Sequence, residues 1–330
     1  MAIEMNAPGN SAAKAKSRAT GFIRIGVSIA ILLFLFSFAP VGELLARMKL
    51  VSPLLWLGVF AGFLVGHAMS AAKWRWMIGG AVSYPRALKA HFAGLAANLA
   101  MPGVAGGDIV RAGLVMKGSQ KKTSLAIGSL GDRLIDTASL IIISSIGAYW
   151  LGKREGVDPD GLAIVASATV GAGFAGVIML KPIARLLRKF APAGKFGKIV
   201  NDVADAAEEM STRRGAVFGC AVISIVVQLG FAMMNGLIAQ NIGAGTSIAA
   251  WVFAWPLAKL VATLPISFGG LGVREASIAG LMTPLGYQAT GVIAASLVWQ
   301  TIQFATGAIG ALAHLVGPAQ NGAPAENRNG

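Results

Sequence analysis

The chain alternates between long apolar stretches and short polar segments, and the stretches contain little charge. Six of them are long enough to cross a bilayer as helices, because about 20 consecutive apolar residues span its hydrocarbon core. These stretches cover residues 21–39, 54–78, 124–151, 162–180, 216–240 and 289–316. The pattern therefore predicts an all-α polytopic membrane protein with six full transmembrane helices.

Two further apolar regions are broken into pairs of pieces, each too short to cross a membrane alone. The pieces cover residues 88–100 and 108–116 in the first pair, and 248–264 and 271–282 in the second. Each break has the pattern P-x3-G-G-x3-R, from Pro102 to Arg111 and from Pro265 to Arg274. Proline removes a backbone donor and Gly-Gly permits a sharp reversal, so we expect each pair to form a re-entrant helical hairpin.

Positive charge is distributed unevenly around these predicted spans. Most of the 28 lysines and arginines fall in residues 1–24, 73–122 and 181–214. Because positively charged loops remain on the cytoplasmic side, both termini are predicted to be cytoplasmic. The two hairpins then enter the membrane from opposite sides, which predicts an inverted-topology repeat over about 54–151 and 216–316.

A single transmembrane domain, residues 21–317, is expected between two short polar tails. Residues 1–20 and 318–330 form these tails, and both are predicted to be disordered. The longest polar segment, 181–214, is predicted to be cytoplasmic. Apolar residues at i, i+3, i+4 and i+7 from Ile183 favour an amphipathic helix at the membrane surface, and a solvated loop is the alternative.

The composition narrows the class of protein further. The chain is 55% hydrophobic and 13% charged, whereas about a quarter of the residues in soluble domains are charged. A net charge of +14 would suit a nucleic-acid partner, but the basic residues flank apolar stretches and are not interleaved with aromatic residues. Anionic headgroups of membrane lipids are therefore the expected partners, and nucleic acid is not.

The sequence contains no recognisable enzyme signature. It lacks the G-x4-G-K-[ST] loop for ATP, the H-E-x-x-H zinc motif and the G-x-S-x-G nucleophile elbow. One cysteine excludes an intramolecular disulfide, and His67, His91 and His314 lack the spacing of metal ligands. We therefore expect a protein that is not an enzyme and that uses neither a cofactor nor a metal.

The two arginines that follow the breaks mark the candidate binding site. An arginine at membrane depth costs at least about 2.5 kcal/mol, so Arg111 and Arg274 require an explanation. A guanidinium group is shaped to bind phosphate, which suggests an anionic headgroup. The alternative is that ion pairs lock the hairpins. The candidate partners are Asp108 and Asp132 for Arg111, and Glu275 and Asp136 for Arg274.

Several other residues complete the predicted site. Pro102 and Pro265 are predicted hinges at the two breaks. The predicted substrate-binding residues are Arg111, Arg274, Asp108, Glu275, Gly106, Gly107, Gly269, Gly270, Asn98 and Ser267. A second group consists of Asp132, Arg133 and Asp136, whose carboxylates are four residues apart and share a helix face. We expect an internal ion-pair lock there, with proton coupling as the alternative.

The sequence also predicts where two lysines in the apolar stretches lie relative to the membrane surface. Lys73 begins the run Lys-Trp-Arg-Trp, and tryptophan beside basic residues is typical of an anchor at the membrane interface. Lys259 lies within the stretch 248–264, and it either extends to the surface or lines a cavity.

The motifs resemble the lysylphosphatidylglycerol synthase transmembrane-region, or flippase-like, family. The resemblance covers about residues 21–317 and rests on three elements: Asn98-x3-Pro102-Gly103-x2-Gly106-Gly107-Asp108-x2-Arg111, Asp132-Arg133-x2-Asp136, and Pro265-x3-Gly269-Gly270-Leu271-Gly272-x-Arg274-Glu275. It implies a protein of the bacterial inner membrane that is connected with moving lipids between leaflets. Only a short tail follows residue 317, so lysyl-lipid synthesis by an aminoacyl transferase domain is not expected.

The expected function is movement of an anionic phospholipid, or of a lipid-linked glycan or hopanoid-type lipid, between leaflets. Its headgroup would be held between the two hairpin tips. One alternative is a secondary transporter of a small anion or other solute. Another is a non-transporting subunit that partners a lipid-synthesising enzyme. The sequence carries no signal for an oligomeric state.

Overall fold

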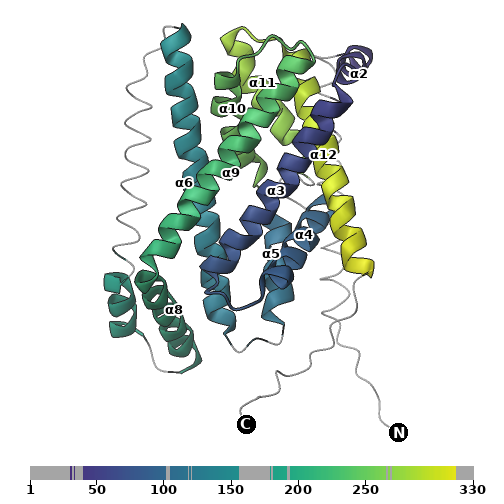
Figure 1. Cartoon of the computed structure of the whole chain (residues 1–330). Helices are drawn as coiled ribbons and strands as arrows, with labels where there is room; N and C mark the ends of the chain where they lie inside the picture. Colours follow the sequence, from purple (N-terminus) through teal and green to yellow (C-terminus); the bar gives the residue numbers. More distant parts are fainter. Residues whose placement is uncertain are drawn as a thin grey trace.

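The computed structural model describes residues 30–31, 33, 40–101, 105–117, 119, 121–155, 179, 181–191, 194–264, 267 and 270–316. Every regular element within these residues is a helix (Figure 1), which confirms the prediction of an all-α protein. Two of the predicted spans, 21–39 and 162–180, lie almost entirely outside the described residues.

Four of the described helices are long and apolar enough to cross a membrane. They are α3 (Pro53–Met77), α6 (Lys122–Glu155), α9 (Arg214–Asn241) and α12 (Ala289–Val316). Each one covers a predicted span. The four helices extend between the same two ends of the molecule in Figure 1, and α9 packs against the other three. The chain is therefore a multi-pass membrane protein.

Two pairs of shorter helices occupy opposite halves of this bundle. In Figure 1, α4 (Tyr84–Ala100) and α5 (Ala105–Met116) pack together in the lower half. Their counterparts α10 (Ile248–Ala262) and α11 (Val273–Met282) pack together in the upper half. Long helices flank each pair, because α4 packs against α12 and α10 packs against α6 and α9. The pairs lie at the positions of the two predicted hairpins, and their re-entrant path in a membrane stays a prediction.

The first break uses its glycines for close packing. The sequence predicted a helix from Asp108, but α5 begins at Ala105 and contains both glycines of the Gly-Gly pair. A Cβ atom on Gly107 would lie 2.2 Å from the carbonyl oxygen of Gly94, so only glycine permits this approach of α4 and α5. Asn98 Oδ1 accepts a hydrogen bond from the Gly107 N–H at 2.7 Å.

The second break uses its glycines to turn the chain. Gly270 and Gly272 have φ angles of +77° and +81°, which residues with a side chain rarely adopt. The N–H of Gly272 donates to Glu275 Oε2 at 2.8 Å, so the carboxylate caps the start of α11. Pro102, Pro265 and Gly269 lie outside the described residues.

Two polar helices lie beside each other at the lower end of the view in Figure 1. They are α8 (Lys195–Thr212) and a helical segment over 181–189. Arg188 joins them, because its guanidinium donates to Asp205 and Glu208 at 2.6 Å each. The bond to Asp205, followed by that to Glu208, raises the pKa of Arg188 above its ordinary value. Residues 181–189 are helical, so the prediction of a helix there is correct. The position of this helix at the membrane surface remains a prediction.

Two short elements complete the described fold. α2 (Val41–Met48) lies at the upper end and packs against α12. A 3-10 turn, η1 (Thr283–Leu285), follows α11.

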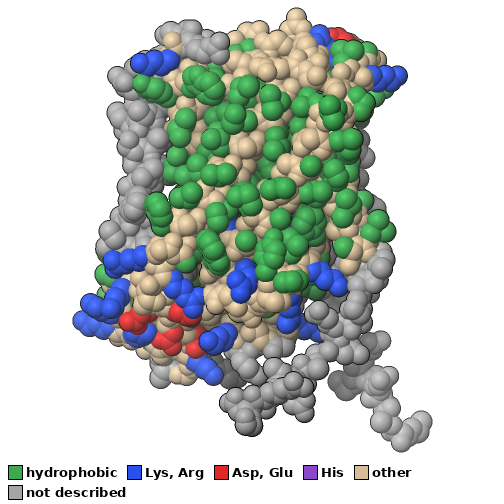
Figure 2. All heavy atoms as spheres, viewed as in Figure 1, with side chains coloured by type: hydrophobic (Ala, Val, Ile, Leu, Met, Phe, Trp, Pro, Cys, Tyr) green, Lys and Arg blue, Asp and Glu red, His purple; other side chains and the backbone are tan. Residues whose placement is uncertain are grey.

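Charge is separated along the bundle as the sequence predicted. Figure 2 shows a broad apolar belt around the middle, with many Lys and Arg side chains at the end that carries α8. A few basic side chains lie at the opposite end in Figure 2. Helix α2, which contains Arg47 and is followed by Lys49, lies at that end in Figure 1. The assignment of the basic end to the cytoplasm follows from the tendency of positive loops to remain inside, and it stays a prediction.

Candidate binding cavity

A cavity of about 140 Å³ lies between three of the long helices and helices of the two short pairs. Its walls come from α3, α4, α9, α10, α12 and the residues around the start of α11. Aromatic side chains form much of this wall. The rings of Phe63 and Trp299 meet edge to face with centroids 5.0 Å apart, and those of Trp255 and Trp299 do so at 6.1 Å. The cavity is therefore rigidly lined and largely apolar, with polar groups at a few positions.

Arg274 is one of these polar groups. It occupies the first turn of α11, and its guanidinium donates to Glu275 Oε1 at 2.6 Å. Two glutamine oxygens of α12 accept its other bonds, at 2.7 Å from Gln300 and 2.6 Å from Gln303. Of the two carboxylate partners that the sequence suggested, the structure selects Glu275. Its side chain is buried, and Nε has no acceptor among the described residues.

Lys259 is the second cation of the cavity wall. Its Nζ donates to Gln228 Oε1 at 2.7 Å and lies 5.1 Å from the centroid of the Trp255 ring. No carboxylate of the described residues lies within 4 Å of this ammonium group. Of the two alternatives for Lys259, the structure therefore supports a lysine that lines the cavity. A cation inside a bundle of membrane-spanning helices is costly unless a paired anion or an anionic ligand compensates its charge.

The cavity wall offers hydrogen-bond donors in excess of acceptors. Trp255 Nε1, Trp299 Nε1 and Arg274 Nε are buried and have no acceptor within the described part of the chain. The amide oxygens in the wall are already engaged: those of Gln300 and Gln303 accept from Arg274, and that of Asn98 accepts from Gly107. These three donor atoms have almost no accessible surface, so the group in the wall that favours a ligand with negative charge and acceptor oxygens is the Lys259 ammonium group.

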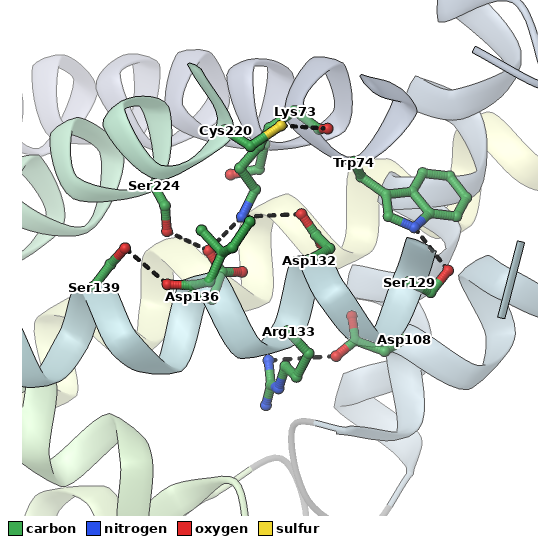
Figure 3. Close-up of polar contacts among 12 residues, drawn as sticks. Lys73, Trp74, Asp108, Ser129, Asp132, Arg133, Asp136, Ser139, Cys220 and Ser224 are labelled. Atoms are coloured by element: carbon green, nitrogen blue, oxygen red, sulfur yellow. Dashed lines mark hydrogen bonds and ion pairs between the residues drawn. The ribbon is translucent and has the colours of Figure 1, made fainter. Parts of the chain in front are cut away.

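A network of ion pairs lies beside the cavity, between α3, α5, α6 and α9 (Figure 3). At its centre, Lys73 Nζ lies 3.1 Å from Asp132 Oδ1 and also contacts Asp136. Ser224 of α9 donates to Asp136 as well. The interpretation of Lys73 as an interface anchor is wrong, because its side chain is buried between two carboxylates that compensate its charge. Its neighbour Trp74 is also buried.

Arg111 belongs to this network and does not line the cavity. Its Nη2 lies 3.1 Å from Asp132 Oδ2 and 3.2 Å from Asp108 Oδ1. The guanidinium also stacks over the ring of Trp74, at 4.5 Å from the centroid. Arg133 extends the network, with Nη1 at 3.3 Å from Asp108 Oδ2. The two motif arginines therefore have different surroundings, although their sequence positions match.

The network is electrically balanced. Its cations are Lys73, Arg111 and Arg133, and its anions are Asp108, Asp132 and Asp136. Lys73, Arg111 and Asp132 are buried, whereas Asp108 and Arg133 are about one-third exposed. A balanced set of charges joins the helices and leaves no surplus charge for a ligand. A structural lock would have this arrangement, and that role of Asp132, Arg133 and Asp136 stays a prediction.

Sequence reasoning missed a pair of histidines that connects the network to the cavity. His67 Nδ1 lies 3.0 Å from His91 Nε2, and His91 Nδ1 lies 3.1 Å from Arg111 Nη1. The side chain of His67 lines the cavity. The two histidines are 24 positions apart and lie on different helices, so no local pattern indicated their contact. Within the described residues, no group of three or more His, Cys, Asp or Glu side chains is arranged to hold a metal ion.

The remaining predicted residues are distributed around the cavity. Asn98 is part of its wall and fixes Gly107, while Gly106 packs against Met101. Gly270 forms the turn before α11. Ser267 is buried, and its hydroxyl has no partner among the described residues.

These features define a multi-pass membrane protein with an internal, donor-rich cavity and an adjoining ion-pair network. The chain belongs to the lysylphosphatidylglycerol synthase TM region family, whose profile matches residues 21–310. The family resemblance of the motifs is thereby confirmed. The chain is also similar to a UPF0104 membrane protein of Methanothermobacter thermautotrophicus, with 24% identity over 303 residues that cover 82% of this chain and 86% of the relative. The family is described as a transmembrane region of a lipid synthase, which fits a membrane protein of lipid metabolism.

Proposed function

We propose that this protein moves an anionic lipid between the leaflets of its membrane. The observation that carries the proposal is Lys259, a cation without a paired carboxylate in the described residues, in the wall of a donor-rich cavity. Three of the helices that line the cavity, α3, α9 and α12, are long and apolar enough to cross a membrane. A negatively charged headgroup with several oxygens would compensate the charge of Lys259 and accept hydrogen bonds from its ammonium group.

The arrangement of the short helices suggests how such a lipid would move. α4 and α5 lie in one half of the bundle and α10 and α11 in the other, as expected for two re-entrant hairpins in an inverted repeat. The cavity lies between the end of α4 and the start of α11. In this proposal Lys259 and Arg274 hold the headgroup while the acyl chains remain in the bilayer. Arg111 supports the site from the neighbouring ion-pair network.

Leaflet exchange in proteoliposomes tests the proposal. The purified chain is reconstituted with fluorescent phosphatidylglycerol or phosphatidylcholine, and dithionite then quenches the outer leaflet. We expect faster exchange of phosphatidylglycerol than in empty vesicles, and a slower rate for Arg274→Gln, which loses the charge that faces the cavity. No exchange of any anionic lipid above the rate of empty vesicles would contradict the proposal.

The size of the cavity favours a second candidate, transport of a small anion. A volume of about 140 Å³ is that of about four or five water molecules, enough for an isolated oxyanion. Uptake of radiolabelled phosphate into the same vesicles, without lipid exchange, would identify this function. Activity found only in a complex with a lipid-synthesising enzyme, and surviving Arg274→Gln, would instead indicate a non-transporting subunit.

A further inference from the structure

Three hydrogen-bonded side chains lead from the ion-pair network to the cavity. The chemistry of these side chains fixes the direction of each hydrogen bond between them. They are Arg111, His91 and His67. The nitrogen–nitrogen distance is 3.1 Å between Arg111 and His91 and 3.0 Å between His91 and His67. Arg111 is held at its far end by Asp132 and Asp108. Each histidine can in principle exist as either of two neutral tautomers or as a cation.

The guanidinium group decides between these forms. Arginine only donates hydrogen bonds, so His91 Nδ1 must accept from Arg111 and cannot carry a proton. His91 is therefore neutral and carries its proton on Nε2. That N–H donates to His67 Nδ1, which must also be unprotonated. The proton of His67 consequently resides on Nε2, the ring nitrogen that is not bonded to His91.

His67, the last of these three side chains, lies at the cavity. The side chain of His67 lines the cavity, and its Nε2 has no partner among the described residues. We infer that His67 Nε2–H is a ligand-binding donor of the cavity and that Arg111, acting through His91, sets its orientation. The positive charge of Arg111 polarises the two imidazoles, which strengthens the donor at the far end.

This assignment narrows the class of ligand. The cavity then presents the His67 donor and the cations Lys259 and Arg274, while the amide oxygens of Gln300 and Gln303 in its wall already accept from Arg274. Such a lining fits an acceptor-only, anionic group such as a phosphodiester, and disfavours an ammonium group. The inference rests on the proposed function for the source of that group. Its two possible sources are a lipid headgroup and free phosphate.

The assignment also gives Arg111 a role that its position outside the cavity leaves unexplained. It is a positioning residue, because it contacts His91 and two carboxylates and acts on the ligand only through His67. Lysine at this position would preserve a charged donor, whereas methionine would preserve bulk without any donor. The two substitutions therefore separate the orienting role from simple packing.

Nitrogen NMR of the histidines tests the inference. The chain contains three histidines, so ¹⁵N-histidine labelling of the full-length protein in detergent micelles, with His314→Gln as background, leaves only His67 and His91. Each resonance is assigned from His67→Gln and His91→Gln. We expect a bare Nδ1 and a protonated Nε2 on both rings. A protonated Nδ1 on either ring in the wild-type background would overturn the inference without any further variant.

Titration with soluble probes completes the test. Dihexanoylphosphatidylglycerol should shift the His67 Nε2 resonance, and dihexanoylphosphatidylcholine should bind about tenfold more weakly or not at all. A shift with inorganic phosphate alone would identify free phosphate as the source of the ligand. No shift with either anion would overturn the role of His67. Since these are binding measurements, they stand apart from the result of the leaflet-exchange assay.

The arginine variants provide the final comparison. Arg111→Met should remove the preference for a protonated Nε2 on both histidines and weaken binding of dihexanoylphosphatidylglycerol by about tenfold. Arg111→Lys should retain both the protonated Nε2 and the affinity. Equal loss of affinity in both variants, with unchanged tautomers, would show that Arg111 acts only by packing.

Discussion

Two lysines near the centre of this protein have opposite surroundings. Lys73 lies between Asp132 and Asp136, whereas Lys259 contacts Gln228 and the face of Trp255. Removing one partner of a buried ion pair leaves the other charge uncompensated. We therefore expect Lys73→Met to lower the free energy of unfolding by about 3–5 kcal/mol.

Lys259→Met is the matched control, because it removes a cation that has no carboxylate partner in the described structure. Its stability should remain close to that of the wild type. Thermal unfolding midpoints in the same detergent measure both variants. Equal destabilisation of the two variants would show that the carboxylate partners of Lys73 do not make it more important for stability than Lys259.

The surroundings of these lysines could be predicted only in part. The apolar flanks of Lys259 already indicated two alternatives, the surface or a cavity. The aromatic neighbours of Lys73 suggested the membrane interface, yet its partner Asp136 lies 63 positions away on another helix. His67 and His91 were missed for the same reason, since a contact between helices leaves no periodic signal along the chain. The pairing of Arg111 with Asp108 was predictable because the two residues belong to one motif, and Asp132 was a candidate because it is an acidic residue in the next motif.

At the scale of helices, the contact between α4 and α5 depends on one glycine. A Cβ on Gly107 would lie 2.2 Å from the backbone oxygen of Gly94, which has no flexible atom to move aside. Gly107→Ala should therefore destabilise the protein by roughly 1–3 kcal/mol through overpacking. Thermal unfolding in detergent measures the effect.

Gly113 on the same helix is the control for this substitution. A Cβ there meets nothing within 4 Å, and the residue is helical. Gly113→Ala should be neutral or stabilise by up to about 1 kcal/mol, because alanine favours a helix. Loss of stability in both variants would mean that α5 tolerates no alanine for reasons other than its contact with α4.

The long apolar elements were predictable because length and hydropathy are local properties. The spans at 54–78, 124–151, 216–240 and 289–316 all correspond to described helices. The different uses of the two Gly-Gly pairs were not predictable. Close packing at Gly107 depends on where α4 lies, and the turn at Gly270 depends on how α11 is capped. The two Gly-Gly pairs therefore have the same sequence but different structural roles.

At the scale of the whole molecule, the asymmetry of charge predicts the orientation in the membrane. The sole cysteine is buried, so Cys220→Ala provides a background for single-cysteine labelling. Lys198→Cys on α8 should react with an impermeant thiol reagent only in inverted vesicles, because the basic end is predicted to be cytoplasmic. Glu43→Cys on α2 should react only in right-side-out vesicles. The reverse pattern would invert the predicted topology.

The central claim is that the cavity between the two pairs of short helices receives an anionic headgroup. The most direct test is the ratio of leaflet-exchange rates for phosphatidylglycerol and phosphatidylcholine, measured for the wild type and for Lys259→Met. The wild type should prefer the anionic lipid, and the variant should lose about tenfold in this preference while its folded yield is unchanged. An unchanged preference in folded Lys259→Met would contradict the account.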